Sequence, residues 1–131
     1  MKYPQKISQA IVRFGLLIVL QCCVVFSVQA NQANVVDVKI TALGDNRYRI
    51  DATLRHADTG WKHYANAWQV FDPSGKLLGE RVLHHPHVNE QPFTRSATIV
   101  IPANVKKVTI RARDSLHGLN DNGMTVLVPK K

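Results

Sequence analysis

Residues 47–55 of the chain read Arg-Tyr-Arg-Ile-Asp-Ala-Thr-Leu-Arg, in which polar and apolar side chains alternate without interruption. Successive side chains of a β-strand point to opposite faces, so the segment would gather its apolar residues on one face. That face holds Tyr48, Ile50, Ala52 and Leu54. The stretch therefore predicts a strand with one face in a core and the other in water.

The same period of two recurs along the chain, and no segment after residue 30 keeps a helical period over ten residues. Turn sequences such as Asp72-Pro73-Ser74-Gly75 separate the candidate strands. We predict seven strands, at residues 36–41, 47–55, 61–71, 77–83, 93–101, 105–113 and 124–128. Such a pattern predicts an all-β fold, a single seven-stranded antiparallel sandwich of the immunoglobulin-like type.

The alternation also predicts which side chains form the core. Apolar residues that share the inward face of their strands should pack together between the two sheets. The predicted core residues are Ile50, Leu54, Trp68, Val70, Ile99, Val108, Ile110 and Val126.

Three features point to a known kind of domain. Pro102-Ala103-Asn104-Val105 precedes the sixth strand, a glycine-bearing loop precedes the seventh, and Trp68 lies in the third. With this order of strands, the chain resembles small secreted immunoglobulin-like or fibronectin-like β-sandwich domains of bacteria. The cysteine pair of antibody domains is missing after residue 30. The resemblance implies a fold and no activity.

The first 30 residues have the composition of a secretory signal peptide. Lysines and an arginine precede an apolar run over residues 14–28, and Val28-Gln29-Ala30 supplies small residues where a signal peptidase cleaves. We predict cleavage after Ala30. Residues 31–131 would then form one immunoglobulin-like domain in the periplasm or outside the cell, without a stable membrane anchor.

Two other fates of this N-terminal segment are less favoured. Retained as an anchor, the apolar run of 15 residues falls short of the roughly 20 that span a bilayer. Lipidation requires a small residue before the modified cysteine, and Gln21 precedes Cys22.

Charge and cysteine content exclude several functions. The chain carries 17 basic and 9 acidic residues, and three of the basic ones lie in the signal segment. The exported domain therefore has a formal charge of about +5 instead of +8, which removes the main support for nucleic-acid binding. Both cysteines, Cys22 and Cys23, also lie in the signal segment, so the domain has no thiol for catalysis, redox chemistry or iron–sulfur binding.

The histidines gather at one end of the predicted fold. Successive antiparallel strands run in opposite directions, so alternate connections lie at opposite ends. The connections at residues 56–60, 84–92 and 114–123 share one end and contain or adjoin every histidine of the chain. These histidines are His56, His63, His84, His85, His87 and His117.

Such an end can supply the three or four imidazoles of a metal site. His85-Pro86-His87 is its sharpest element, because two imidazoles one residue apart can chelate one ion. The predicted ligands are His63, His85, His87 and His117, with His84, Glu90 and Asp114 as residues that support them. Without cysteine, the donors favour Zn(II) or Cu(II) over Cu(I). His56 continues the inward face of its strand and is predicted to be packed and hydrogen-bonded.

The sequence thus predicts a non-enzymatic exported protein that binds a divalent metal. The alternative is a protein–protein interaction module of the cell envelope, in which loops or a strand edge contact another protein and the histidines are incidental. Asp114, Ser115 and His117 superficially form a hydrolytic triad, but they lie within four residues, and catalytic triads normally converge from separate segments. No phosphate-binding glycine loop or dinucleotide fingerprint is present.

Overall fold

The computed structural model describes residues 32–130, which contain eight β-strands and no helix. The strands are β1 (Asn34–Gly44), β2 (Arg47–Arg55), β3 (Ala65–Phe71), β4 (Leu77–Val82), β5 (Phe93–Val100), β6 (Lys107–Asp114), β7 (Gly118–Leu119) and β8 (Met124–Leu127). Within these residues, no helix is long and apolar enough to cross a membrane. The predicted signal peptide, residues 1–30, lies outside the described residues.

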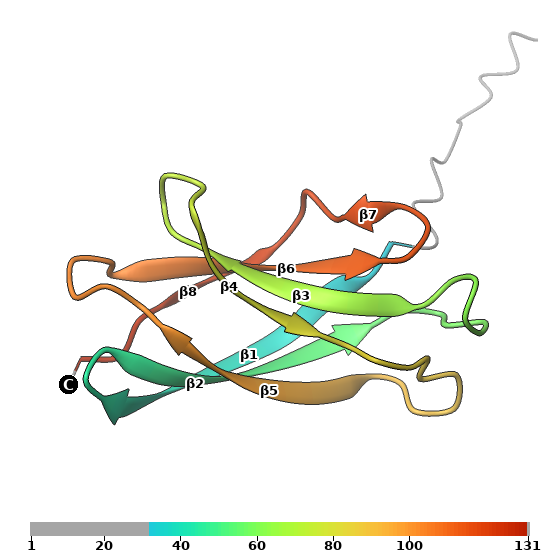
Figure 1. Ribbon diagram of the computed structural model, residues 1–131, viewed down its shortest axis with the longest axis horizontal. Coiled ribbons are helices and arrows are strands. Elements are labelled where there is room, and N and C mark those ends of the chain that lie inside the picture. Colours follow the sequence, from blue (N-terminus) through green and yellow to red (C-terminus); the bar gives the residue numbers. More distant parts are fainter. Residues whose placement is uncertain (1–31, 131) are drawn as a thin grey trace, which may run out of the picture.

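The strands form two antiparallel sheets (Figure 1). The first has the order β1-β2-β5, with β2 in the centre. The second has the order β4-β3-β6-β7, and β8 also pairs with β6. The all-β antiparallel prediction is confirmed.

The prediction of seven strands is wrong by one. The additional strand, β7, is two residues long and pairs with the end of β6. The Asp114 side chain shapes the turn before it, because Oδ1 accepts hydrogen bonds from the backbone N–H groups of Leu116 and His117. Gly118, at a φ of 75°, completes the reversal. A strand of two residues is too short to show the alternation from which strands are predicted, and the turn before it depends on a buried side chain.

The third strand also begins later than predicted, at Ala65 instead of Trp61. Residues 60–63 form a tight turn, in which the N–H of His63 donates to the Gly60 carbonyl at 3.2 Å. Gly60 has a φ of 143°, a backbone conformation that other residues rarely adopt. The turn brings His63 back toward the end of β2.

One hydrophobic core joins the two sheets. Of the eight predicted core residues, all except Val126 are buried, and Val126 is partly buried against the same cluster. The apolar face of β2 is buried along its whole length, as its alternation predicted. Trp68 is among the largest fully buried side chains. The predicted core is confirmed.

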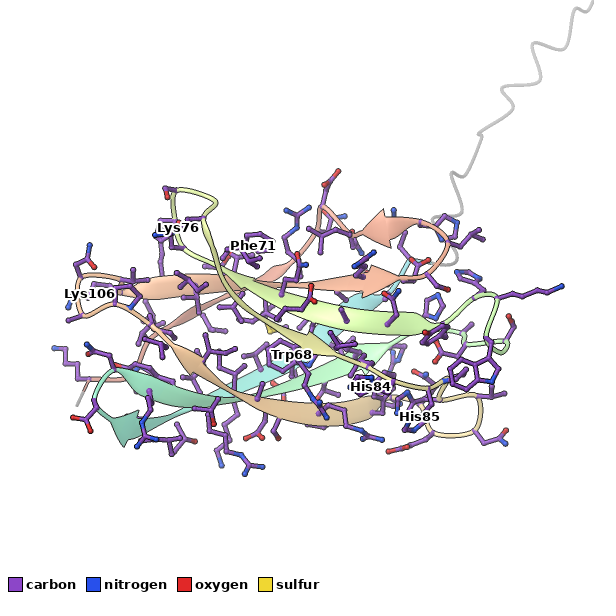
Figure 2. All side chains as sticks on the ribbon, in the orientation of Figure 1. Trp68, Phe71, Lys76, His84, His85 and Lys106 are labelled. Atoms are coloured by element: carbon purple, nitrogen blue, oxygen red, sulfur yellow. The ribbon has the colours of Figure 1, made fainter. Side chains whose placement is uncertain are left out.

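The connections lie at two ends of the molecule. Residues 56–64, 83–92 and 115–117 join β2 to β3, β4 to β5 and β6 to β7, and we call them the histidine end (right in Figure 1). Residues 45–46, 72–76 and 101–106 form the opposite, turn end. Figure 2 shows His84 and His85 at the first end and Lys76 and Lys106 at the second. The predicted division of connections between the two ends is confirmed.

Candidate metal centre

Two histidines of the β2–β3 connection face each other inside the histidine end. His56 continues the inward face of β2, and its side chain is fully buried. The turn at Gly60 returns the chain so that His63 Nε2 lies 3.2 Å from His56 Nε2. The two rings meet edge to face, with centroids 4.6 Å apart. The His63 side chain is 13% exposed, so the pair lies just below the surface.

The third member of this cluster is Asp114, the last residue of β6. Its carboxylate is fully buried, and Oδ1 lies 3.2 Å from His63 Nε2. Burial raises the pKa of Asp114, but the backbone N–H donors of His117 and Leu116, aided by the His117 ring, outweigh burial and hold that pKa below its usual range. Oδ2 is buried and has no hydrogen-bond partner among residues 32–130. The carboxylate is therefore ionised at neutral pH and has unused acceptor capacity.

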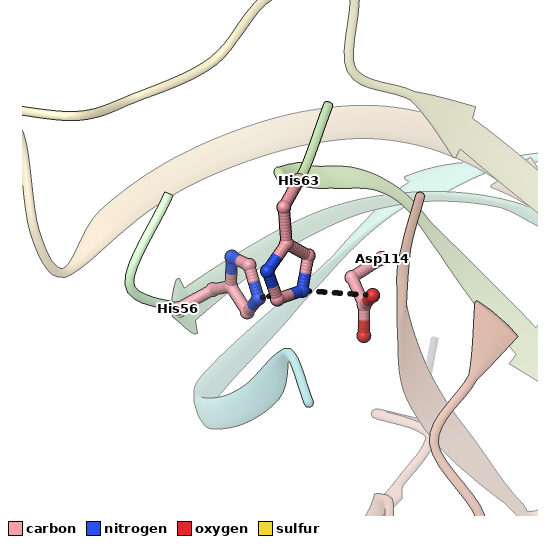
Figure 3. Close-up of side chains that lie close together, drawn as sticks. All are labelled: His56, His63 and Asp114. Carbon is pink, nitrogen blue, oxygen red and sulfur yellow. Dashed lines mark hydrogen bonds and ion pairs between the residues drawn. The ribbon is translucent and has the colours of Figure 1, made fainter. Parts of the chain in front are cut away.

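The spacing of these three residues suits ligands of one small cation. One donor atom each from His56, His63 and Asp114 forms a group whose members all lie within 4.8 Å of one another (Figure 3). In a tetrahedral zinc site, with Zn–N bonds of about 2.0–2.1 Å, neighbouring donor atoms are about 3.3 Å apart. The two separations of 3.2 Å in the cluster are close to this value.

In the contacts that join His56, His63 and Asp114, two acceptors face one proton. His56 Nδ1 contacts the carboxylate of Asp58, so a neutral His56 ring carries its proton on Nδ1 and presents its Nε2 lone pair to His63. The Nε2–H of His63 then faces two acceptors, His56 Nε2 and Asp114 Oδ1, at 3.2 Å each. Metal binding to imidazoles releases such protons, and a divalent cation satisfies all three donors at once.

His117 lies beside this group. Its Nδ1 is 3.1 Å from Asp114 Oδ1, and its ring centroid is 5.0 Å from that of His63. The side chain is 38% exposed, more than that of His63. His117 thus shares the carboxylate with His63 but is outside the group in which all donors lie within 4.8 Å.

The other two predicted ligands, His85 and His87, form a separate pair with ring centroids 4.6 Å apart. His87 is buried and stacks on Phe93 at 3.9 Å, and the guanidinium of Arg95 lies 2.9 Å from its Nε2. Burial, assisted by the charges of Arg95 and His85, lowers the pKa of His87. Because an arginine only donates, Nε2 must be the acceptor, and the single proton of the neutral ring occupies Nδ1. Nε2 is thus engaged by Arg95, while Nδ1 is buried without a hydrogen-bond partner among residues 32–130 and lies outside the donor group.

Of the three residues predicted to support the ligands, one lies in the donor group and two lie outside it. Asp114 lies within the donor group, whereas His84 and Glu90 are exposed on the β4–β5 connection. Glu90 pairs with Arg95 at 3.1 Å, and this hydrogen bond holds the pKa of Glu90 below its usual range. The structure therefore brings together His63, His117 and Asp114 and keeps His84, His85, His87 and Glu90 out of the donor group.

Sequence reasoning did not include His56 among the ligands. Its prediction as a buried, hydrogen-bonded residue is confirmed, and the same burial places Nε2 in the cluster. The available signal was the spacing His56-x-Asp58, which puts a carboxylate next to Nδ1 and directs Nε2 away from it. Metal-binding histidines commonly have such a carboxylate behind them.

Comparison with known proteins gives one informative relative. The chain is 41% identical over 95 residues to a protein of Halomicrobium mukohataei described as a "putative lipoprotein". The match covers 72% of this chain and 47% of the relative, so the chain spans about half the length of the curated protein that it matches. No family model matches the chain. No solved structure matches it either.

Proposed function

We propose that this is a non-enzymatic, exported or envelope-associated protein that binds one divalent cation, Zn(II) or Cu(II), through His56, His63 and Asp114. The observation that carries the proposal is the convergence of two imidazoles and a buried carboxylate within 4.8 Å, with Asp114 Oδ2 lacking a hydrogen-bond partner among the described residues. Nitrogen and oxygen donors suit these two ions. His117, next to Asp114, is the fourth donor that we propose.

The proposed setting and fold rest on separate observations. The signal-like N-terminus and the name of the lipoprotein relative both support a place outside the cytoplasm. The antiparallel order of the two sheets, and their shared core around Trp68, support an immunoglobulin-like sandwich. A binding role, without catalysis, fits a donor group in which the side chains of His56 and Asp114 are fully buried.

Titration calorimetry with Zn(II) and with Cu(II) at pH 7.5 tests the proposal. We expect one ion per chain, and a loss of affinity of at least about tenfold in His63→Ala. His85→Ala is the matched control, because His85 lies at the same end but outside the donor group, and its affinity should equal that of the unmodified protein. Affinity should also weaken at pH 5.5, since ligating imidazoles must lose their protons.

Two results would decide against this site. Absence of binding by the unmodified protein would remove the proposed function altogether. If His85→Ala lost metal affinity and His63→Ala did not, the metal site would be the His85–His87 pair on the β4–β5 connection.

A second candidate function, an interaction module of the envelope, is favoured by one observation. Each of the three connections at the histidine end carries a large exposed apolar side chain: Trp61 is 68% exposed, Leu116 65% and Val88 53%. Exposed apolar side chains on connections that share one end are typical of contact surfaces, although Leu127, Val100 and Leu77 are exposed elsewhere. A photo-crosslinking residue at position 61 tests this in intact cells, with position 43, an exposed leucine at the turn end, as control. Crosslinked adducts formed from position 61 but not from position 43 would favour the interaction module.

A further inference from the structure

Asp58 is a buried carboxylate outside the donor group that contacts both the group and a neighbouring connection. Its side chain is fully buried. Oδ1 contacts His56 Nδ1 and accepts the backbone N–H of Ala65 at 2.9 Å. Oδ2 accepts the backbone N–H of His87 at 2.7 Å. Asp58 therefore joins the start of β3, the ring of His56 and the β4–β5 connection.

These contacts determine which nitrogen of His56 faces the donor group. The backbone N–H groups of Ala65 and His87 can only donate, so both oxygens of Asp58 act as acceptors. An ionised Asp58 has no hydrogen to donate, so in a neutral His56 ring the single proton lies on Nδ1. The Nε2 lone pair consequently points toward His63, which is the tautomer that a metal at Nε2 requires.

The β4–β5 connection is attached to His56 by two separate routes. One route runs from the His56 ring through Asp58 to the His87 N–H. The other runs through Gln91, whose Oε1 accepts the His56 backbone N–H at 3.0 Å and whose Nε2 donates to the His87 carbonyl at 3.0 Å. Only the first route includes the imidazole that would bind the metal.

We propose that Asp58 is the positioning residue of this metal site and that it links metal occupancy to the order of the β4–β5 connection. The inference rests on the proposed function. A metal on His56 Nε2 holds the ring in place, the ring holds Asp58, and Asp58 holds the His87 N–H. Metal binding should therefore suppress local opening at His87, even though His87 is not a ligand.

The tautomer of His56 can be measured in the unmodified protein. Long-range ¹H–¹⁵N spectra distinguish a ring protonated at Nδ1 from one protonated at Nε2. We expect the Nδ1–H form both before and after addition of Zn(II). An Nε2–H form of His56 in either state would overturn the positioning role, and this measurement does not depend on a variant that folds.

Two variants separate the two routes. Asp58→Asn replaces an oxygen by an amide NH₂, which cannot accept the N–H groups that Asp58 now receives. We expect zinc affinity to fall about 10- to 100-fold in this variant, with a partial change of His56 to the Nε2–H tautomer. Gln91→Ala breaks only the route through the backbone, so its zinc affinity and its His56 tautomer should be unchanged.

Hydrogen exchange at the His87 amide measures the link itself. At free zinc one hundred times the dissociation constant, openings that disrupt the site become about 100-fold rarer. The His87 amide should exchange more slowly by up to this factor in the unmodified protein and in Gln91→Ala, and should not respond to zinc in Asp58→Asn. The Gly75 amide, bonded to the Asp72 carbonyl at the turn end, is the internal control and should not respond in any of them.

The outcomes distinguish this inference from the function on which it rests. If the unmodified protein binds no zinc, the proposed function fails. If it binds zinc while Asp58→Asn binds equally well, or while the His87 amide does not respond, the site stands and the positioning role of Asp58 is overturned.

Discussion

The β3–β4 turn at the turn end is held by its own residues, whereas the β2–β3 and β4–β5 connections at the histidine end are bonded to each other. At the turn end, Asp72 Oδ1 accepts the N–H groups of Ser74 and Lys76, each at 2.9 Å, within a single turn. At the histidine end, Asp58 accepts an N–H from His87, 29 positions along the chain. A turn whose polar groups bond to one another is determined by its local sequence. Asp58 reaches its partner His87 only after both sheets have assembled, whereas the N–H partners of Asp114 lie in its own turn.

This difference in hydrogen bonding also bears on where atoms available to a ligand are found. A turn that satisfies its own polar groups has few donor atoms left for a ligand. Asp114, in contrast, is buried with one oxygen that has no hydrogen-bond partner among residues 32–130. Burying such a group is unfavourable by itself, and this is one of the grounds on which we propose a ligand there.

The largest effect that we expect concerns the core that both ends share. Trp68→Ala should lower the free energy of unfolding by about 3–5 kcal/mol, because it leaves a cavity between the sheets. Urea unfolding, followed by NMR signals of the Gly75 and Gly118 amides, checks both the size of the loss and the comparison of the ends. Coincident loss of the two signals is expected for a single cooperative core. Separate transitions would mean that the ends differ in stability as well as in bonding.

The second effect contrasts the two kinds of aspartate. Asp114→Ala removes the acceptor of two backbone N–H groups in a buried turn and should lower the free energy of unfolding by about 3 kcal/mol. Asp72→Ala removes two similar bonds at the surface, where water replaces them, so the loss should be clearly smaller. Chemical denaturation of both variants at pH 7.5 without metal measures the difference. Equal losses would show that burial does not distinguish the two ends.

The third effect is a pH dependence from His87. Burial lowers the pKa of His87 in the folded state, so below about pH 6.5 the unfolded chain takes up a proton that the folded protein does not. Its contribution to stability is therefore complete above about pH 6.5 and is lost as the pH falls toward the lowered folded pKa, by at most about 1.4 kcal/mol per pH unit. Denaturation at pH 7.5 and 5.5 should show a smaller drop in His87→Phe than in the unmodified protein. His84→Ala, at an exposed position, should retain the full drop.

The parts of the fold that could be predicted from sequence are those that local chemistry determines. The alternation in residues 47–55 predicted β2 and its buried face, because side-chain direction in a strand depends only on sequence position. The turn at Asp45 and Asn46, where both residues have positive φ, is one that aspartate and asparagine tolerate. The convergence of histidines at one end followed from the order of the strands alone.

The composition of the donor group could not be predicted in this way. His85-Pro86-His87 has the spacing of a chelating pair, but Phe93 and Arg95 of β5 engage the ring of His87. His56 was predicted to be a packed residue from its position, and only its distance to His63 places it in the donor group. In both cases the deciding contact joins separate connections or strands, and its geometry is invisible until the chain is folded.

The smallest effect comes from a matched pair of glycines, one at each end. Gly75 and Gly118 have φ values of 83° and 75°, and an added Cβ would meet no atom within 4 Å at either position. Alanine should therefore introduce only backbone strain, of about 1 kcal/mol, and by nearly the same amount in both variants. Unfolding measurements on Gly75→Ala and Gly118→Ala check this equality.

Zinc titration of the same two variants then compares the effect of equal strain at each end on zinc affinity. Gly118 follows His117, whose N–H donates to Asp114 Oδ1 at 2.7 Å, so strain at Gly118 should displace a donor that holds the carboxylate. Gly118→Ala should weaken zinc binding, while Gly75→Ala should leave it unchanged, although both proteins lose the same stability. If both variants lose zinc affinity together, binding follows global stability. The distinction between the self-contained β3–β4 turn and the connected histidine end would then not hold.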